Sequence, residues 1–368
     1  MFDFAIYKYQ FISSWLRHAG GFNRMKICDA QKEPKLSIII PCYNYSAFVG
    51  KAISSVIGQN NRESEIIVVD DGSTDGSWDI INNFDVRAYR LPNGGALQAC
   101  IFGLDHTTAP FVLFLDADDM LAPNSLNKIL ALVDEKVAKL QYSLGLIDSE
   151  GRFIGSAAPA LDDYRERSEI IHRVLRTGFY KTPPTSGNVF RRDVCNILRE
   201  IDYEKYVDGV ILYAAPFMGD IVSTSDELGF YRVHNHNVSS VGKALDAEVI
   251  RRDLRRFSFR MRHLQNFINA KTNYEPTYEI ENNFVVQERS IYLTLSVGKK
   301  PSLSDVKNVI WKLLKQDEHS IKSKLALSTL FVSTLLLSNR NSVKIANYRN
   351  KVTHRSVIGL IKYIFRAQ

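Results

Sequence analysis

Acidic side chains stand directly after two apolar runs of this sequence, where they could bind a cation or the hydrogen-bond donors of a ligand. They are Asp70 and Asp71 after residues 66–69, and Asp116, Asp118 and Asp119 after residues 111–115. Neighbouring carboxylates raise one another's pKa unless a cation or a donor compensates their charge. Because these ligands are all oxygens, Mg²⁺ or Mn²⁺ is the expected ion. The simpler alternative, a turn with a helix cap, needs only one such oxygen.

An alternation of short apolar runs and amphipathic helices must position these carboxylates. The predicted strands are 36–40, 65–70, 86–90 and 111–115, and the predicted helices are 47–59, 75–84 and 96–105. Such alternation is typical of βαβ units in a mostly parallel sheet. The strands read as nearly continuous apolar runs because parallel strands are buried on both faces. Ligands bind these sheets at the carboxyl ends of the strands, where both acidic clusters fall.

Beyond residue 123 the periodicity is weaker. It predicts a helix to about residue 137, strands at 140–147 and 151–154, helical structure over 162–178 and a loop at 183–188. A further helix is expected within 189–199, and the chain past residue 246 is expected to be helical.

The composition, with 45% hydrophobic and 24% charged residues, is that of a globular protein. The four cysteines, Cys28, Cys42, Cys100 and Cys195, lack metal-site spacing and are expected to be reduced thiols in a cytoplasmic protein. The first 26 residues show no cleavable signal pattern. No run reaches the roughly 18 apolar residues of a spanning helix. The apolar stretch 325–337 is therefore predicted to be a buried core helix.

Six motifs occur in a characteristic order along the chain. They are IPCYN at 40–44, VDDGSTD at 69–75, NGG at 93–95, LDADD at 115–119, TSGNVFRR at 185–192 and YRVHNHNVS at 231–239. Over residues 35–240 the chain resembles the family 2 glycosyltransferases. The resemblance implies the GT-A fold, an α/β domain at 34–245 with a mostly parallel sheet flanked by helices. An extension at 1–33 would precede it, and a basic, mainly helical region at 246–368 would follow.

The resemblance also implies roles for individual residues. Nucleotide binding falls to Pro41, Tyr43, Asn44, Asp71, Asn93, Gly94, Asp116 and Ala117, with Tyr43 stacking on the base. The metal ligands would be Asp118, Asp116 and His234, and the acceptor side would be shaped by Ser186, Gly187 and Asn188. For Asn93 and Gly94 a plain turn is an equally good interpretation.

Asp208 is the expected catalytic base, because it aligns with an acidic pair that precedes an apolar helix in the family. Here Val207 takes the place of the first acid. Glu204, Asp202 or Asp220 is therefore left open as the base, and a helix N-cap is the alternative role for Asp208.

The implied activity is metal-dependent, inverting transfer of a sugar from a nucleoside diphosphate sugar, with UDP-sugar preferred. The acceptor would be a saccharide or a lipid-linked hydroxyl in bacterial polysaccharide or glycolipid assembly. The alternative, favoured by Val207, is a degenerate protein that binds nucleotide sugars or serves as a membrane-associated scaffold. A phosphatase of the DxDx[TV] type is disfavoured because Met120 stands where that motif needs a small or hydroxyl residue.

The positive charge lies in the last third of the chain. Residues 251–368 hold 22 basic and 8 acidic residues, whereas residues 1–250 hold 25 and 32. No nucleic-acid-binding motif accompanies this charge, so no nucleic-acid partner is expected. Arginines 251, 252, 255, 256 and 260 and the segment 357–366 predict either a helix packed on the catalytic domain or peripheral binding to the anionic inner face of the cell membrane.

Overall fold

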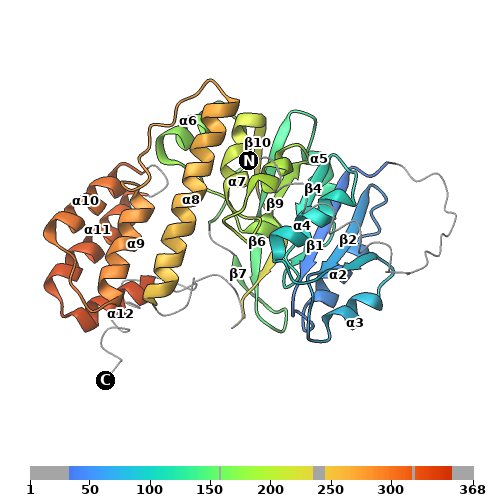
Figure 1. Ribbon diagram of the computed structural model, residues 1–368, viewed down its shortest axis with the longest axis horizontal. Coiled ribbons are helices and arrows are strands. Elements are labelled where there is room, and N and C mark those ends of the chain that lie inside the picture. Colours follow the sequence, from blue (N-terminus) through green and yellow to red (C-terminus); the bar gives the residue numbers. More distant parts are fainter. Residues whose placement is uncertain (1–32, 157–158, 235–244, 317–319, 350–368) are drawn as a thin grey trace, which may run out of the picture. The chain divides into compact units, whose positions relative to one another are not determined.

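Four parallel strands and three helices form the first half of the fold (Figure 1), as the sequence predicts. The computed structural model describes residues 33–156, 159–234, 245–316 and 320–349, and those from Pro34 onward belong to one compact unit. The strands are β1 (Leu36–Cys42), β2 (Ser64–Asp70), β3 (Arg87–Arg90) and β4 (Phe111–Phe114), joined by α2 (Val49–Ile57), α3 (Ser77–Asn82) and α4 (Ala96–Asp105). All pair in parallel, in the order β3-β2-β1-β4. Both acidic clusters therefore lie at the same edge of the sheet.

The second half of the sheet is mixed. The order continues from β4 through β9 (Asn188–Arg191), β6 (Val137–Ile147), β10 (Asp220–Arg232) and β5 (Met120–Leu121). In addition, β7 (Phe153–Ser156) pairs with β6, and β8 (Tyr164–Glu166) pairs with β10. Strand β9 is antiparallel to both β4 and β6, while β6 and β10 are parallel. The mixed α/β class implied by the resemblance is confirmed.

Several predicted boundaries are wrong. Residues 188–191 form a strand, and only a 3-10 helix (Val194–Glu200) follows, because pairing with β4 and β6 buries Val189 and Phe190 completely or nearly so. Tertiary pairing here overrides local pattern. Helix α5 (Ser125–Leu132) stops before Val137, which already belongs to β6. In the predicted helix 162–178, only α6 (Ser168–Thr177) is helical.

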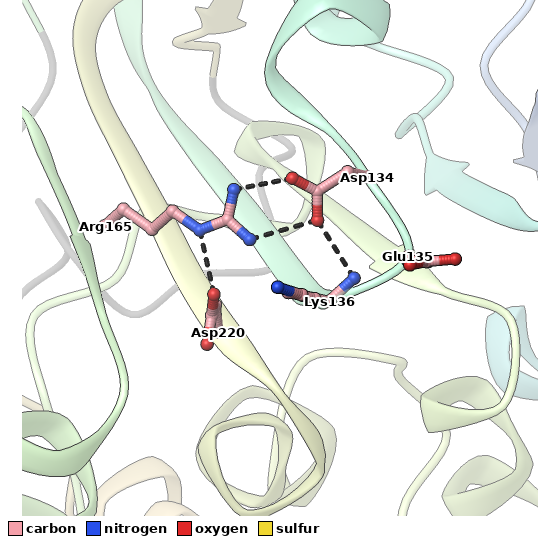
Figure 2. Close-up of a pocket in the computed structure, with 5 residues that line it drawn as sticks. All are labelled: Asp134, Glu135, Lys136, Arg165 and Asp220. Carbon is pink, nitrogen blue, oxygen red and sulfur yellow. Dashed lines mark hydrogen bonds and ion pairs between the residues drawn. The ribbon is translucent and has the colours of Figure 1, made fainter.

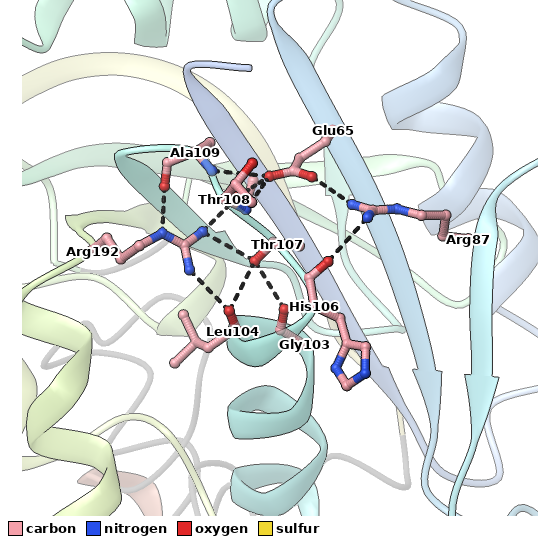
Figure 3. Close-up of polar contacts among 10 residues, drawn as sticks. Glu65, Arg87, Gly103, Leu104, His106, Thr107, Thr108, Ala109 and Arg192 are labelled. Carbon is pink, nitrogen blue, oxygen red and sulfur yellow. Dashed lines mark hydrogen bonds and ion pairs between the residues drawn. The ribbon is translucent and has the colours of Figure 1, made fainter. Parts of the chain in front are cut away.

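A polar cluster ties β9 to the parallel strands (Figure 3). The guanidinium of Arg192, just after β9, donates to the carbonyls of Ala109 and Leu104 and to the Thr107 hydroxyl. Glu65 on β2 accepts from the backbone N–H groups of Thr108 and Ala109 and pairs with Arg87. Arg192 of the TSGNVFRR motif is thus a structural residue. Its hydrogen bonds go to the segment between α4 and β4, and not to the acidic clusters.

Helix α7 (Val210–Met218) precedes β10. The regular elements in the described residues after β10 are all helices: α8 (Ala247–Lys271), α9 (Phe284–Ser296), α10 (Leu303–Leu314), α11 (Ile321–Leu336) and α12 (Asn339–Arg349). Met261 and Leu264 of α8 share a core with Val210 of α7, whereas Ile250, nearer the start of α8, joins a separate core with α9 to α12. Helix α8 thus packs on both groups of elements. None of the helices in the described residues combines the length and apolar content needed to cross a membrane.

Candidate active site

Asp71, in the loop after β2, connects this loop to the segment that contains Asn93 and Gly94. The buried Asp71 carboxylate accepts hydrogen bonds from the N–H groups of Gly94 (2.7 Å) and Gly95 (2.8 Å). Gly72 has a left-handed φ of 75°, and a Cβ there would lie 2.8 Å from the Asn93 nitrogen. Asp71 therefore organises the loop that the sequence predicts for the nucleotide.

Residues at the end of β1 and just after it lie beside the loop that follows β2. The side-chain oxygen of Asn44 accepts from the N–H groups of Thr74 and Asp75, and Asn44 itself has a left-handed φ of 58°. Its amide oxygen is therefore occupied by the loop, which indicates a supporting role. The ring of Tyr43 is 44% exposed and is free to stack on a planar group, while Pro41 lies within β1.

The carboxylates after β4 lie in two different environments. Asp119 is buried and accepts from the Ser186 hydroxyl (2.6 Å) and from the Arg232 N–H (2.9 Å). The same Ser186 hydroxyl accepts from the backbone N–H of Asp116 (3.1 Å). No hydrogen-bond donor from the described residues reaches the Asp116 carboxylate. Asp119 is thus a structural member of the triplet, whereas Asp116 is available to a ligand.

Mutual repulsion marks this cluster. Burial first, and then the charges of Asp119, Asp118 and Asp208, raise the pKa of Asp116 well above its ordinary value. Burial and the charge of Asp118 also raise the pKa of Asp119, against hydrogen bonds from Ser186 and Arg232 that lower it. Since each of these charges acts on Asp116, Asp208 lies within electrostatic reach of the β4 end.

His234 lies against Asp118. Its Nε2 is 2.9 Å from the Asp118 Oδ2, and its ring packs 4.8 Å from the ring of Phe48. Arg232, two residues earlier and fully buried, donates from Nε to the Asp118 carbonyl (2.7 Å). Arg232 at the end of β10 and His234 just after it therefore both bind Asp118. His236 lies outside the described residues.

The donor set fits a divalent cation of the Mg²⁺ or Mn²⁺ kind. Asp116 and Asp118 supply oxygen ligands whose repulsion a cation would relieve, and Mg²⁺ usually takes only one or two protein carboxylates. Across the described ranges, no group of three or more His, Cys, Asp or Glu side chains is arranged to hold a metal. Waters and substrate phosphates would have to complete the coordination.

The predicted acceptor-side residues form a buried loop next to Asp119. The Asn188 amide donates to the carbonyls of Pro183, Pro184 and Thr185, so it shapes this loop and is not accessible to a ligand. The Tyr142 hydroxyl donates to the Ser186 carbonyl (2.5 Å). Sequence reasoning gave no role to Tyr142, since only the fold brings it beside Ser186.

We expect Gly187→Ala to destabilise the protein by about 1–3 kcal/mol, because inserting a methyl group into a packed site forces its neighbours apart. A Cβ at Gly187 would lie 2.8 Å from the Pro183 ring and 3.0 Å from the Tyr142 carbonyl oxygen. Urea unfolding would measure the change. The matched control is Gly76→Ala, whose Cβ would meet its nearest neighbour at 3.9 Å. Equal stability of the two variants would contradict the tight packing of this loop.

Asp208 precedes α7 and lies beside Arg260 of α8. Its side chain is 46% exposed, and its Oδ1 lies 3.9 Å from the Arg260 guanidinium of α8. Desolvation raises the pKa of Asp208, Arg260 lowers it and the Glu204 charge raises it. Val207 is buried in the main core, so an acid there would not face the site.

Glu204 is clamped between two arginines of α8. Its carboxylate accepts from Arg256 Nε (2.9 Å) and from Arg260 Nε (2.5 Å), and its side chain is almost fully buried. The arginines are only partly exposed, and Arg256 also lies 4.8 Å from the Tyr206 ring. Arg256 and Arg260 therefore face inward, which for these two agrees with the predicted alternative of a helix packed on the catalytic domain. A carboxylate so held is a poor base.

Asp220, another open alternative, is the first residue of β10, at the opposite end of the strand from Arg232. Figure 2 shows it beside Arg165. There it accepts from Arg165 Nε (2.8 Å), and the same guanidinium holds Asp134 through two hydrogen bonds and lowers the pKa of Asp134 to about 2. Apart from Asp220, none of the predicted site residues lines this hollow on the surface. Asp202 is exposed near Glu204 and stays an alternative base.

Comparison with known proteins places this site in a family. Residues 37–195 match the family described as Glycosyl transferase family 2. An uncharacterized glycosyltransferase of Nostoc sp. is 34% identical over 217 residues, covering 55% of this chain and 66% of the relative. These matches identify residues 37–195 as a family 2 glycosyltransferase domain.

Further relatives match the chain over shorter stretches. The GalNAc(5)-diNAcBac-PP-undecaprenol beta-1,3-glucosyltransferase of Campylobacter jejuni is 33% identical over 129 residues, 32% of this chain and 40% of that protein. The chain thus covers less than two thirds of the length of either relative. The crystal structure of S. aureus TarS 1-349 in complex with UDP-GlcNAc gives a TM-score of 0.46 at 18% identity, covering 86% of this chain and 91% of that one.

Proposed function

We propose that this glycosyltransferase moves a sugar from a nucleoside diphosphate sugar, preferably a UDP-sugar, to an acceptor hydroxyl with inversion. The observation that carries the proposal is the pair of carboxylates directly after β4, with His234 Nε2 2.9 Å from one of them. Asp116 and Asp118 follow β4, and Asp208, which precedes α7, is close enough for its charge to raise the pKa of Asp116. Family membership supplies the reaction class.

The donor would bind across the carboxyl ends of β1, β2 and β4. Tyr43 would stack on the base, and Asp71 with the amides of the 93–95 loop would set the depth of the nucleotide site. Asp116 and Asp118 would hold a Mg²⁺ or Mn²⁺ ion, which when bound stabilises negative charge on the leaving diphosphate. His234 would keep Asp118 oriented through its hydrogen bond.

Asp208 would act on the acceptor. As the acceptor oxygen bonds to the anomeric carbon, the bond from that carbon to the diphosphate breaks, and Asp208 takes the hydroxyl proton. Its partial exposure leaves room for an acceptor, in contrast to the buried Glu204. We infer a saccharide or lipid-linked acceptor. The Campylobacter jejuni relative, whose name gives a polyprenol-linked acceptor, supports the second kind.

A binding assay tests the donor site. We expect UDP to bind in the presence of Mn²⁺, and Asp118→Asn to weaken this binding by about 10–100-fold, since a neutral amide is a poor ligand for the ion. Isothermal titration with and without Mn²⁺ would measure it. Asp226→Asn, an exposed acid paired with Lys128, is the matched control and should bind like the parent chain.

The scaffold alternative predicts a different pattern. A degenerate relative would bind nucleotide sugar without turning it over, and Val207 is the feature that favours it. Donor binding combined with no transfer to any acceptor and no slow donor hydrolysis would favour the scaffold. Failure of every nucleotide to bind, with or without Mn²⁺, would contradict both interpretations.

A further inference from the structure

The outward sides of α10 and α11 carry large apolar side chains that nothing in the described residues covers. They are Leu303, Trp311 and Leu314 on α10, and Ile321, Leu325, Val332 and Leu336 on α11, each between 42% and 80% exposed. We call these seven residues the α10–α11 face. The opposite sides of both helices, including Val309 and Phe331, are fully buried in the C-terminal core. Both helices therefore carry apolar residues on two sides. One side is buried in the C-terminal core, and the other is exposed.

Helical periodicity gathers the exposed residues into stripes. On α11 the spacing i, i+4, i+11, i+15 from Ile321 to Leu336 stays within about 60° of arc at 3.6 residues per turn. On α10, Leu303, Trp311 and Leu314 lie within about 80° by the same geometry. Each set thus lies on one side of its helix, with Lys307 between Leu303 and Trp311 on α10, and Ser328 and Thr329 between Leu325 and Val332 on α11.

The two stripes adjoin each other. Helices α10 and α11 are packed together (Figure 1), and contacts at both ends show that they run antiparallel. Lys324 Nζ lies 2.8 Å from the Leu314 carbonyl, and Lys300 Nζ lies 3.5 Å from the Leu335 carbonyl. The α10–α11 face therefore belongs to two neighbouring helices that pack against each other.

Lysines lie beside this surface and, in the case of Lys307, within it. Lys299, Lys300, Lys307, Lys315 and Lys322 are exposed on the same helices or the turn before them, and Lys315 Nζ lies 4.5 Å from the centre of the Trp311 ring. Residues 297–349 contain ten basic and three acidic residues. An apolar partner with a negative rim would match both features.

We propose that the α10–α11 face docks on the surface of an anionic lipid bilayer, with both helices lying in the plane of the interface. Contiguous exposed apolar surface marks an interaction site. Apolar side chains would enter the boundary of the acyl chains, Trp311 would sit at headgroup level, and the lysines would meet anionic headgroups. The docking surface thereby lies on α10 and α11, and not on the α8 arginines that bind Glu204.

Flotation of the full-length protein with vesicles tests this docking without donor or acceptor, so its outcome is independent of the transferase proposal. We expect binding to vesicles of phosphatidylcholine with about one-third phosphatidylglycerol, and little binding to phosphatidylcholine alone. Raising the salt from about 0.1 M to about 0.5 M should weaken binding severalfold, because it screens the lysines. The double variant Trp311→Ser, Leu325→Ser should bind at least about tenfold more weakly. Lys315→Glu with Lys322→Glu should lose about tenfold as well.

Matched variants control for general effects. Phe153→Ser removes an aromatic ring that is 59% exposed, against 56% for Trp311, from β7. Lys271→Glu reverses an exposed charge at the end of α8. Both should float like the parent chain, and circular dichroism should show all variants folded. Binding that ignores the α10–α11 substitutions would overturn the proposal. So would a dimer that Trp311→Ser, Leu325→Ser converts to a monomer while vesicles bind neither form, since a second copy would then be the occupant.

Discussion

Replacing Asp208 by asparagine should slow sugar transfer by about 10³-fold, because a general base in this position contributes between about 10² and 10⁴ to the rate. Asparagine keeps the shape of the side chain but cannot take the acceptor proton. Donor binding should be unchanged, since Asp208 Oδ1 lies 3.9 Å from Arg260 and no hydrogen bond within the described residues joins its side chain to the 93–95 loop. Single-turnover transfer and UDP titration on the same sample would separate the two effects.

Asp202→Asn is the matched comparison. Asp202 lies six residues earlier in the same segment and is exposed, so its loss should leave transfer within about twofold of the parent rate, in keeping with the small effects of exposed charges. If Asp202→Asn abolished transfer and Asp208→Asn did not, the base would be Asp202.

The raised pKa of Asp208 predicts a change in the pH dependence of transfer. As the solution is acidified, Asp208 should take up a proton at a higher pH than an ordinary aspartate, so the rate of transfer should begin to fall at that higher pH. Asp116, Glu204, Arg256 and Arg260 are the charged groups that act on or beside Asp208.

Glu204→Ala should cost about 3–5 kcal/mol of unfolding free energy, because it leaves two largely buried guanidinium groups without their carboxylate. Arg256 and Arg260 of α8 both bind Glu204, so the substitution releases the contact between α8 and the segment before α7. Guanidinium chloride unfolding would measure the loss. Transfer should also fall, since Arg260 is the residue that lies beside Asp208.

The exposed pair Arg262–Glu281 provides the control, because both of its side chains are more than half exposed. Glu281→Ala should leave the unfolding transition unchanged. A double-mutant cycle of Glu204→Ala with Arg260→Ala would isolate the coupling, which should exceed about 1 kcal/mol for residues in one network. Additive effects would show that the clamp does not act as a unit.

Helix α8 links the two cores on which these predictions depend. Its second half packs with α7, and its first half packs with α9 to α12. The same helix therefore supports Asp208 through Arg260 and joins the α10–α11 face to the catalytic domain. If that face binds a bilayer, then α8 connects the membrane-bound helices to Asp208, the proposed base for an acceptor held at the membrane.

The first half of the fold and its acidic edge could be predicted from the sequence. Continuous apolar runs and intervening amphipathic helices depend on neighbours close in sequence, so β1 to β4 and the acids at their ends were identified correctly. Order and spacing of the six motifs sufficed for the family. Strand β9 was missed, because its four residues are extended only through pairing with β4 and β6.

The division of labour among the polar residues was decided by tertiary structure. Sequence placed Asn44 and Asn188 with the ligand-binding residues, yet backbone groups brought close by the fold occupy both side chains. It also grouped the α8 arginines as one surface, whereas Glu204, about fifty residues earlier, turns two of them inward. Residue type and spacing determined which chemistry was possible here. Which carboxylates are left for a ligand depends on long-range hydrogen bonds, and only folding decides where those form.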